Sequence, residues 1–274
     1  MLKSMYTGIS GIRANQTKMD VVSNNVANVG TTSFKKSNAR FSDTLYITSM
    51  YAQAPGTLGG INPSLVGVGT EISGIFKNTV QGNIQTTGRT SDLALDGDGY
   101  FKVKIGENKF AYTRDGSFNI DKNGNLVTAQ GYQVLGIDNE PIEIPTEQDG
   151  RKVLDYMISS EGEVSLILEN KSNTDTDVDD EQIVNNQKLN IVLFKNPEGL
   201  EMLSDNLYGV SVNSGDPIEN ASHTKIKQGA IEISNVDISE EFTDMIVTTR
   251  AFQASSKVIT TSDELLQEII NLKR

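Results

Sequence analysis

Apolar side chains recur at alternating steps of three and four residues over the first 28 residues of the chain. The positions in this register are Leu2, Met5, Ile9, Ile12, Gln16, Met19, Ser23 and Val26. Such spacing lines one side of an α-helix and is typical of helices that pack against other helices. It predicts an N-terminal helix with an interaction surface, which we call the N-terminal stripe.

The last 38 residues repeat this pattern. Its positions, the C-terminal stripe, are Ile238, Phe242, Met245, Thr249, Phe252, Ser256, Ile259, Asp263, Leu266 and Ile270. Leaving about twelve apolar side chains of the two stripes in water would forfeit on the order of 18 kcal/mol at ~1.5 kcal/mol each. We therefore expect the helices to pack against copies of the chain. An internal helical hairpin, or ends that order only in a polymer, are the alternatives.

Between the helices the apolar period changes to two, which is typical of half-buried strands. Asp-Gly at 115–116 and Asn-Gly at 123–124 predict tight hairpin turns. Strands are expected at 65–80, 100–105, 109–113, 117–120, 125–129, 132–137, 163–169, 189–194 and 207–212. The predicted fold class is α+β, with N- and C-terminal coiled-coil-like helices flanking an antiparallel β-rich middle domain.

Composition divides the chain into three parts. Residues 1–30 and 236–274 form the expected helical polymerisation domain. Residues 31–80 are polar at first and rich in Pro and Gly at 52–63, which indicates an extended connector. Residues 81–235 form the expected antiparallel β domain. An acidic low-complexity insertion at 170–188 interrupts it, and we expect a solvated loop there.

Charge and residue usage exclude several classes of function. The 274 residues carry a formal net charge of −12, a single His and no Cys. Negative charge opposes binding to nucleic acid or to an anionic membrane surface. The absence of Cys removes disulfides, thiolate metal sites and cysteine nucleophiles. The apolar runs are too short for a spanning helix or a cleavable signal peptide, so we expect neither membrane insertion nor signal cleavage.

Three glycine-containing segments resemble ligand loops but fit ordinary turns better. Asp-Gly-Asp-Gly at 96–99 leads into a strand, whereas a phosphate loop should open a helix. The segment 121–125 places its glycine fourth, where a calcium loop needs it sixth. The glycines within 67–74 miss the dinucleotide-binding spacing. We predict turns at the first two segments and no phosphate site at the third.

The remaining candidates for chemistry are weak. Asp175, Asp177, Asp179 and Asp180 alternate as calcium ligands can, but the sixth-place Gly and twelfth-place Glu are absent. His223 has no evident nucleophile or ligand partner. We therefore expect no catalytic, cofactor or metal site and no enzyme. A β-rich enzyme would need two carboxylates ~5 to ~10 Å apart. A monomeric binding module would need the two stripes to pair internally.

Several segments resemble a known family. Asn-Asn-Val-Ala-Asn-Val at 24–29, followed by Thr31 and Phe34-Lys35, is similar to the N-terminal signature of bacterial flagellar rod and hook proteins. Residues 234–274 resemble their C-terminal signature over nearly the whole length. Further similar segments lie at 93–103, 112–136 and 205–210. The resemblance thus covers most of the chain.

This resemblance implies a subunit of an axial tube, polymerised from many copies beyond the cell membrane. It also implies unfolded export through the flagellar type III apparatus without signal cleavage, and contacts with rod, hook-cap and hook-filament junction proteins. The opening of the chain is most similar to hook proteins. We therefore expect an extracellular hook subunit that transmits torque and encloses the export channel. A distal rod protein in the basal body is the alternative.

The family also implies an export-gate signal of the form Phe-x-x-x-apolar just after the first helix. Phe41 and Leu45 fit this form. The alternative is that both side chains dock the connector on a neighbouring domain.

Overall fold

The structure is a computed structural model and describes residues 2–54, 59–106, 109–148, 151–169, 181–219 and 224–272. The chain divides into two compact units, each assembled from segments distant in sequence. Unit 1 comprises Met1–Val29, Lys36–Asn78 and Val236–Arg274, whereas unit 2 comprises Gly30–Lys35 and Thr79–Asn235.

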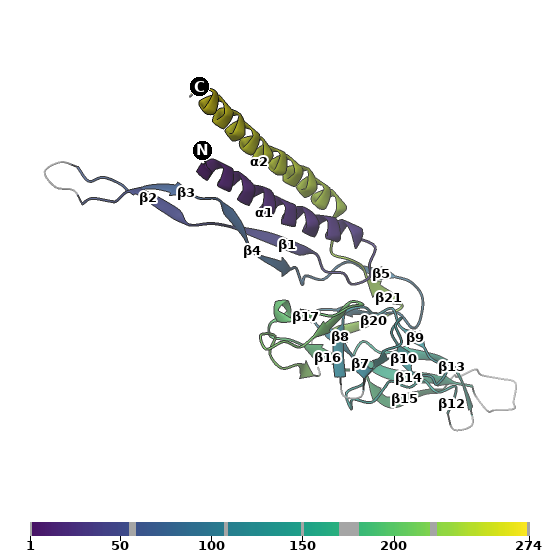
Figure 1. The fold of residues 1–274 in the computed structure, drawn as a ribbon. Coiled ribbons are helices and arrows are strands. Elements are labelled where there is room, and N and C mark those ends of the chain that lie inside the picture. The colour runs from purple at the N-terminus through teal and green to yellow at the C-terminus, as the bar shows by residue number, and fades with distance from the viewer. Residues whose placement is uncertain are drawn as a thin grey trace. The chain divides into compact units, whose positions relative to one another are not determined.

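Two long helices dominate unit 1, as the sequence predicted. Helix α1 (Leu2–Ala27) and helix α2 (Ile238–Leu272) lie side by side in Figure 1. They are antiparallel, because Ser4 near the start of α1 contacts Ser262 near the end of α2, at 3.3 Å between hydroxyl oxygens. Asp237 caps α2 by accepting a hydrogen bond from the amide of Ser239 at 2.8 Å.

Strands of the expected connector also belong to unit 1. β1 (Ser37–Asp43) pairs with β4 (Thr70–Lys77), and β2 (Tyr46–Met50) pairs with β3 (Ser64–Gly67), both antiparallel. The sequence indicated strands only over 65–80. Along β1 the half-buried positions include Ala39 and Ser42, whereas Phe41 is exposed. Large apolar residues therefore do not coincide with the half-buried positions of β1, and an alternating apolar pattern does not predict this strand.

Unit 2 is built from short antiparallel strands in a nine-stranded sheet, a four-stranded sheet and two further pairs. The large sheet contains β7 (Tyr100–Gly106), β8 (Lys109–Thr113), β9 (Asn119–Ile120), β10 (Leu126–Val127), β11 (Gln133–Val134), β16 (Ile191–Leu193), β17 (Glu201–Met202), β18 (Leu207–Gly209) and β19 (Ile218–Glu219). The smaller sheet contains β12 (Glu147–Gln148), β13 (Arg151–Ile158), β14 (Glu163–Leu168) and β15 (Glu181–Lys188). The pairs are β6 (Leu93–Asp96) with β20 (Lys225–Gln228) and β5 (Ile84–Thr86) with β21 (Ala230–Glu232); a 3-10 turn, η1, spans Pro197–Gly199.

The acidic insertion differs from its prediction. Its second half forms β15, which pairs with β14, so the expectation of a solvated loop is wrong for 181–188. Residues 181–188 form a strand because their backbone pairs with β14, and amino-acid composition does not predict such pairing. Residues 170–180, with the four aspartates considered for calcium, lie outside the described residues, as does His223.

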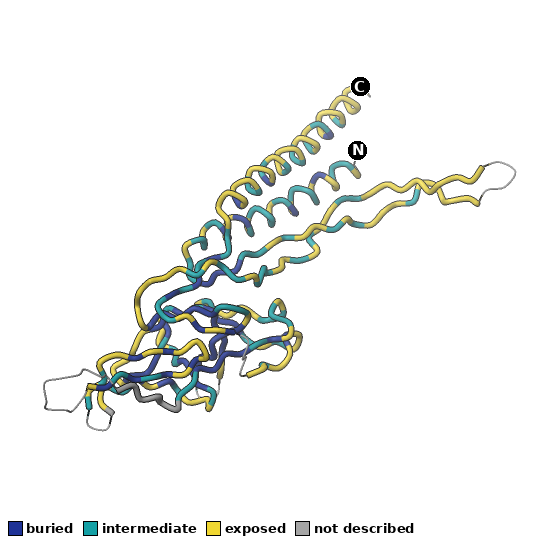
Figure 2. The backbone as a smooth tube through the Cα atoms, turned by 180° about the vertical axis from the view of Figure 1, so that it is seen from behind, coloured by how far each residue is buried: buried dark blue, intermediate teal, exposed yellow. Residues whose placement is uncertain are grey.

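The core of unit 2 consists of apolar side chains from both sheets, from the β6–β20 pair and from the segments between strands. Figure 2 shows the buried positions concentrated in this unit. Phe101 and Phe118 pack edge to face in it, with ring centroids 5.2 Å apart. Buried core residues are Leu93, Leu95, Phe101, Val103, Ala111, Phe118, Leu126, Val134, Ile142, Ile144, Tyr156, Ile158, Val164, Leu166, Leu189, Ile191, Leu207 and Ile226. This apolar core confirms the predicted α+β class with an antiparallel β-rich middle.

Candidate assembly surface

Small side chains set the distance between the two helices of unit 1. A Cβ atom on Gly8 would lie 2.8 Å from Cγ1 of Ile259 and 3.3 Å from the carbonyl oxygen of Ser255. A Cβ atom on Gly11 would lie 3.0 Å from the Ser255 hydroxyl. The helices therefore approach as closely as they do because these two positions of α1 carry no side chain.

Polar contacts hold the other end of the pair. Asn25 is only 1% exposed; its amide nitrogen donates to the carbonyl oxygen of Ser37 at 2.9 Å and to Oε2 of Glu241 at 3.1 Å. The Ser37 amide donates back to Oδ1 of Asn25 at 3.0 Å. The Asn25 side chain thus pairs with β1 as a neighbouring strand would, and it joins α1, β1 and α2. Nearby, Lys36 forms an ion pair with Glu240 at 2.7 Å.

The face that α1 and α2 present to each other, the inner face, combines positions one residue before the predicted stripes with the stripe residue Ile259, which lies against Gly8. Buried inner-face positions include Gly8, Val22 and Asn25 on α1 and Glu241, Thr248 and Ser262 on α2. The corresponding stripe positions are half-buried or exposed. Half-buried stripe residues are Met5, Ile12, Met19, Val26, Met245, Ile259 and Leu266. Exposed apolar stripe residues are Ile9, Ile238, Phe242, Phe252 and Ile270, and the side chain of Leu2 lies outside the described part.

Further large apolar side chains of α2 face solvent but were not part of the predicted stripe. They are Ile246, Val247, Val258, Leu265 and Ile269, each between 43% and 62% exposed. A strict three-and-four spacing omits them because they lie on the other sides of the helix. Exposed apolar surface of this extent marks a binding surface, and we call these residues and the exposed stripe residues the outer apolar surface.

The candidate export-gate residues are also accessible. Phe41 lies on β1 and is 41% exposed, and Leu45 lies between β1 and β2 and is 84% exposed. Phe41 stands opposite Ile72 in the ladder with β4. Neither side chain joins the buried core.

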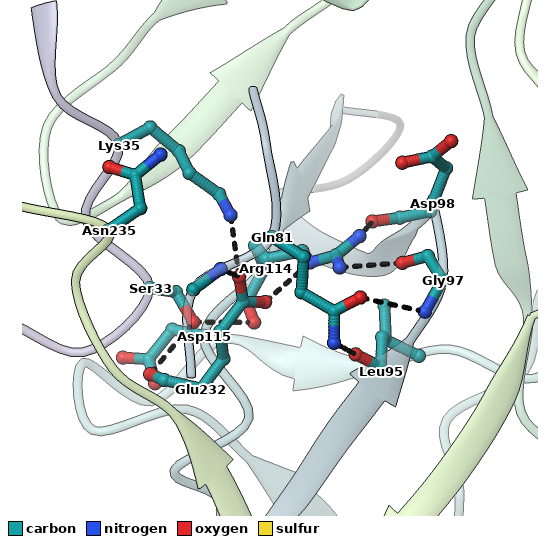
Figure 3. A network of polar contacts seen from close by, with 12 residues as sticks. Ser33, Lys35, Gln81, Leu95, Gly97, Asp98, Arg114, Asp115, Glu232 and Asn235 are labelled. Atoms are coloured by element: carbon teal, nitrogen blue, oxygen red, sulfur yellow. Dashed lines mark hydrogen bonds and ion pairs between the residues drawn. The ribbon is translucent and has the colours of Figure 1, made fainter. Parts of the chain in front are cut away.

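Unit 2 contains a buried ion cluster around Glu232 (Figure 3). The Glu232 carboxylate is 1% exposed and accepts from Lys35 Nζ at 2.5 Å, from Arg114 Nε at 2.7 Å and from the Gly82 amide at 2.7 Å. Burial raises the pKa of Glu232, but Arg114 and Lys35 together outweigh burial and hold the pKa below its usual value. Burial lowers the pKa of Lys35 despite its carboxylate partner.

Arg114 also holds the Asp-Gly-Asp-Gly turn at 96–99 in place. Arg114 donates to the carbonyl oxygen of Gly97 at 2.6 Å and to that of Gly99 at 2.7 Å. The turn joins β6 to β7, and Gly97 has φ +118°, a conformation that suits glycine. Residues 96–99 are therefore a turn between strands, as predicted. So are residues 121–125, where the Gly124 amide donates to the Asp121 carbonyl at 2.8 Å.

Within the described ranges, no three His, Cys, Asp or Glu side chains gather closely enough to hold a metal ion. None of the helices in those ranges combines the length and the hydrophobicity that crossing a bilayer requires.

Unit 1 consists largely of two long helices with an outer apolar surface, and unit 2 has a separate apolar core. These features are typical of a structural protein that assembles with other molecules. Comparison with known families agrees. Residues 5–35 match the description "Flagella basal body rod protein", residues 94–166 match "Flagellar hook protein FlgE/F/G D1 domain", and residues 227–272 match "Flagellar basal body rod FlgEFG protein C-terminal".

Full-length relatives give the same result. The chain is 43% identical to the flagellar basal-body rod protein FlgG of Bacillus subtilis and 39% identical to that of Borreliella burgdorferi, with both chains covered completely in each case. It is 26% identical to the flagellar hook protein FlgE of Borreliella burgdorferi, over 442 aligned positions that cover both chains. The chain belongs to the flagellar rod and hook protein family and is a structural protein of the flagellar axis, with basal-body rod proteins among its relatives.

Proposed function

We propose that this chain is a subunit of the distal rod of the flagellar basal body. The supporting observation is length combined with identity. The FlgG relatives align end to end over 281 and 280 positions, whereas the hook relative needs 442 positions and reaches 26% identity. The opening residues alone favoured a hook subunit. The opening residues, from position 5 on, fall within the match to "Flagella basal body rod protein", and the other two descriptions name FlgE, FlgF and FlgG together, so the terminal motifs do not single out a hook subunit.

The subunit polymerises into a tube through its outer apolar surface, and the tube encloses the export channel. Ser256 and Asp263 interrupt the C-terminal stripe; Ser256 is half-buried and Asp263 is exposed. A charged side chain does not tolerate a dry interface without a partner. We therefore assign this column to the hydrated channel or a wet subunit boundary, with Phe252, Ile259 and Leu266 dry in the polymer.

Electron microscopy of purified protein at high concentration tests this function. Straight tubes support a rod subunit, curved tubes would support a hook subunit, and the absence of any tube would argue against both. Val247→Asp, on the outer apolar surface and 57% exposed, should abolish the tubes. Val210→Asp is the matched control, since Val210 is 45% exposed on unit 2, and it should leave tube formation intact.

Substitution of Phe41 distinguishes export of the chain from its polymerisation. We propose that the type III export apparatus reads Phe41 and Leu45 in the unfolded chain before the subunit joins other axial proteins. Phe41→Ala should then reduce secretion strongly, while the purified variant should still polymerise because the outer apolar surface is unchanged. Normal secretion together with loss of polymerisation would instead assign Phe41 to packing.

A further inference from the structure

Unit 1 contains a groove of about 420 Å³ between α1 and strand β4, with Thr44 after β1 at its edge. Apolar and charged groups share it. Its α1 wall consists of Tyr6, Ile9, Ser10, Arg13, Ala14 and Thr17, and its strand wall of Thr44, Thr70, Glu71 and Ile72. We call it the α1–β4 groove.

A glycine fixes the shape of this groove. Gly69 has φ +143°, and a Cβ atom there would lie 2.2 Å from the Ser10 hydroxyl. Two hydrogen bonds hold the strands in place: Thr7 Oγ1 donates to the carbonyl of Val68 at 3.1 Å, and the Thr70 amide donates to Ser10 Oγ at 3.4 Å. Backbone conformation and hydrogen bonds therefore define the shape of the groove. The glycine at position 69, within the segment 67–74, is required for this close approach to α1.

The far end of α2 offers an amphipathic surface. Beyond Ser262, residues 263–272 continue the helix, and Leu265, Ile269 and Leu272 are 51%, 50% and 86% exposed. Their spacing places them on one side of the helix. Glu264 and Glu268 flank that side, and neither makes an ion pair within the part of the chain that the structure describes. We call residues 263–272 the C-terminal segment.

We propose that the C-terminal segment of one copy docks in the α1–β4 groove of a second copy. This inference rests on the proposed function and specifies one contact of the polymer. Leu265, Ile269 and Leu272 would cover Tyr6 and Ile9, an apolar contact on both sides.

Charge selects both the partner and the orientation. Arg13 on the α1 wall is exposed and makes no ion pair among the described residues. It would face Glu264 and Glu268 of the second copy. Glu71 on the strand wall would repel the same carboxylates in the reverse orientation.

The occupant belongs to another molecule because of helix geometry. At ~100° per residue, Tyr6 and Arg13 lie on nearly the opposite side of α1 from Gly8 and Gly11, which contact α2 of the same chain. A chain therefore cannot place its own C-terminal segment in its own groove while its helices remain paired. A contact between two different surfaces repeats from copy to copy, and it builds an open helical polymer instead of a closed dimer.

Charge reversal tests the contact. Arg13→Glu and the double variant Glu264→Lys/Glu268→Lys should each raise the concentration needed for polymerisation by about two- to fivefold. An equimolar mixture of the two variants should return to the wild-type value, because each groove then meets a segment of opposite charge. The triple variant should do the same alone. Lys3→Glu, on α1 but outside the groove, is the matched control and should have no effect.

The outcome separates this inference from the function on which it rests. If wild-type protein forms tubes but the mixture and the triple variant show no recovery, the groove contact is wrong while the rod subunit stands. If wild-type protein forms no tubes, the proposed function itself fails. Leu265→Ala/Ile269→Ala should raise the required concentration by about tenfold or more, as expected for central apolar contacts, and an unchanged value would also overturn the proposal.

Discussion

In unit 2 the side chains that pack together are large and apolar, whereas the helices of unit 1 meet through glycine, serine and paired polar groups. Leu93 and Phe101 are fully buried in the first case, while Phe242 of α2 is 49% exposed in the second. Figure 2 shows the contrast, with exposed positions along α2 and buried ones concentrated in unit 2. Unit 2 has an apolar core of its own, whereas α2 of unit 1 leaves large apolar side chains exposed.

Hydrogen exchange on dilute, monomeric protein should show the largest difference between the units. Amides of β7 and β8 should exchange only on global unfolding, roughly 5–15 kcal/mol, whereas those of α1 and α2 should exchange through local opening at several kcal/mol less. The reason is that long helices with little apolar contact are marginal in water. Equal protection of helices and strands at micromolar concentration would contradict this prediction.

Loss of the buried charge in unit 2 should have the next largest effect. Glu232→Gln leaves Lys35 and Arg114 as buried cations without a carboxylate, and removal of one partner from such a cluster costs about 3–5 kcal/mol. Denaturant unfolding monitored on unit 2 measures the loss. Glu201→Gln, at an exposed position of β17, is the matched control and should be neutral.

The same carboxylate makes unit 2 sensitive to acid. Its folded-state pKa lies below the ordinary value of 4.5, so its contribution to stability is present above pH 4.5 and is lost as the pH falls through the lower folded-state pKa. Wild-type protein should therefore lose stability below about pH 4.5 more steeply than Glu232→Gln, in unfolding curves measured at several pH values. Parallel pH profiles would rule out this role for the carboxylate.

The helix pair should be sensitive to added volume at one glycine more than at the other. Gly8→Val places atoms against Ile259 and the Ser255 backbone, and overpacking of this kind costs about 1–3 kcal/mol. Gly11→Ala meets only a serine hydroxyl that can rotate, and the gain in helix propensity of about 1 kcal/mol offsets the contact. Helix melting by circular dichroism compares the two, and equal effects would show that the backbones do not approach as described.

The smallest effect is expected at the polar end of the pair. Asn25→Ala removes hydrogen bonds to Ser37 and Glu241 and leaves a buried carboxylate with fewer partners, at a cost of about 1–2 kcal/mol. The loss should appear in the melting of the helices and not in unit 2. Asn24→Ala, the exposed neighbour, is the matched control. Because alanine has the higher helix propensity, a comparable loss there would mean that the buried hydrogen bonds of Asn25 are not the cause.

Sequence patterns predicted the elements that depend on local periodicity. The two helices and the β9–β10 hairpin at Asn123-Gly124 follow from spacing and turn residues, and they are present in the structure. The hairpin predicted at Asp115-Gly116 is wrong, because β8 pairs with β7 and β18 while β9 pairs with β10. β1 was missed because its half-buried residues are small and polar. β15 was missed because acidic composition says nothing about the backbone pairing that β14 offers.

The contact of α1 with α2 was missed by the pattern for a related reason. Gly8 and Gly11 define it, and glycine contributes nothing to an apolar pattern, so the pattern selected Ile9 and Ile12 beside them. Asn25 belongs to a recognisable motif, but its role depends on Glu241, which lies 216 residues away. The ion cluster was missed because Lys35, Arg114 and Glu232 meet only in three dimensions.

The position of Glu232 in the chain also bears on when unit 2 can form. Its bonds reach back 197 residues to Lys35 and 118 residues to Arg114, and β20 and β21 close ladders with strands that precede them by more than a hundred residues. Contacts of such high order form slowly. A polypeptide that emerges from its amino end therefore has no carboxylate for these two buried cations until nearly six-sevenths of it has emerged.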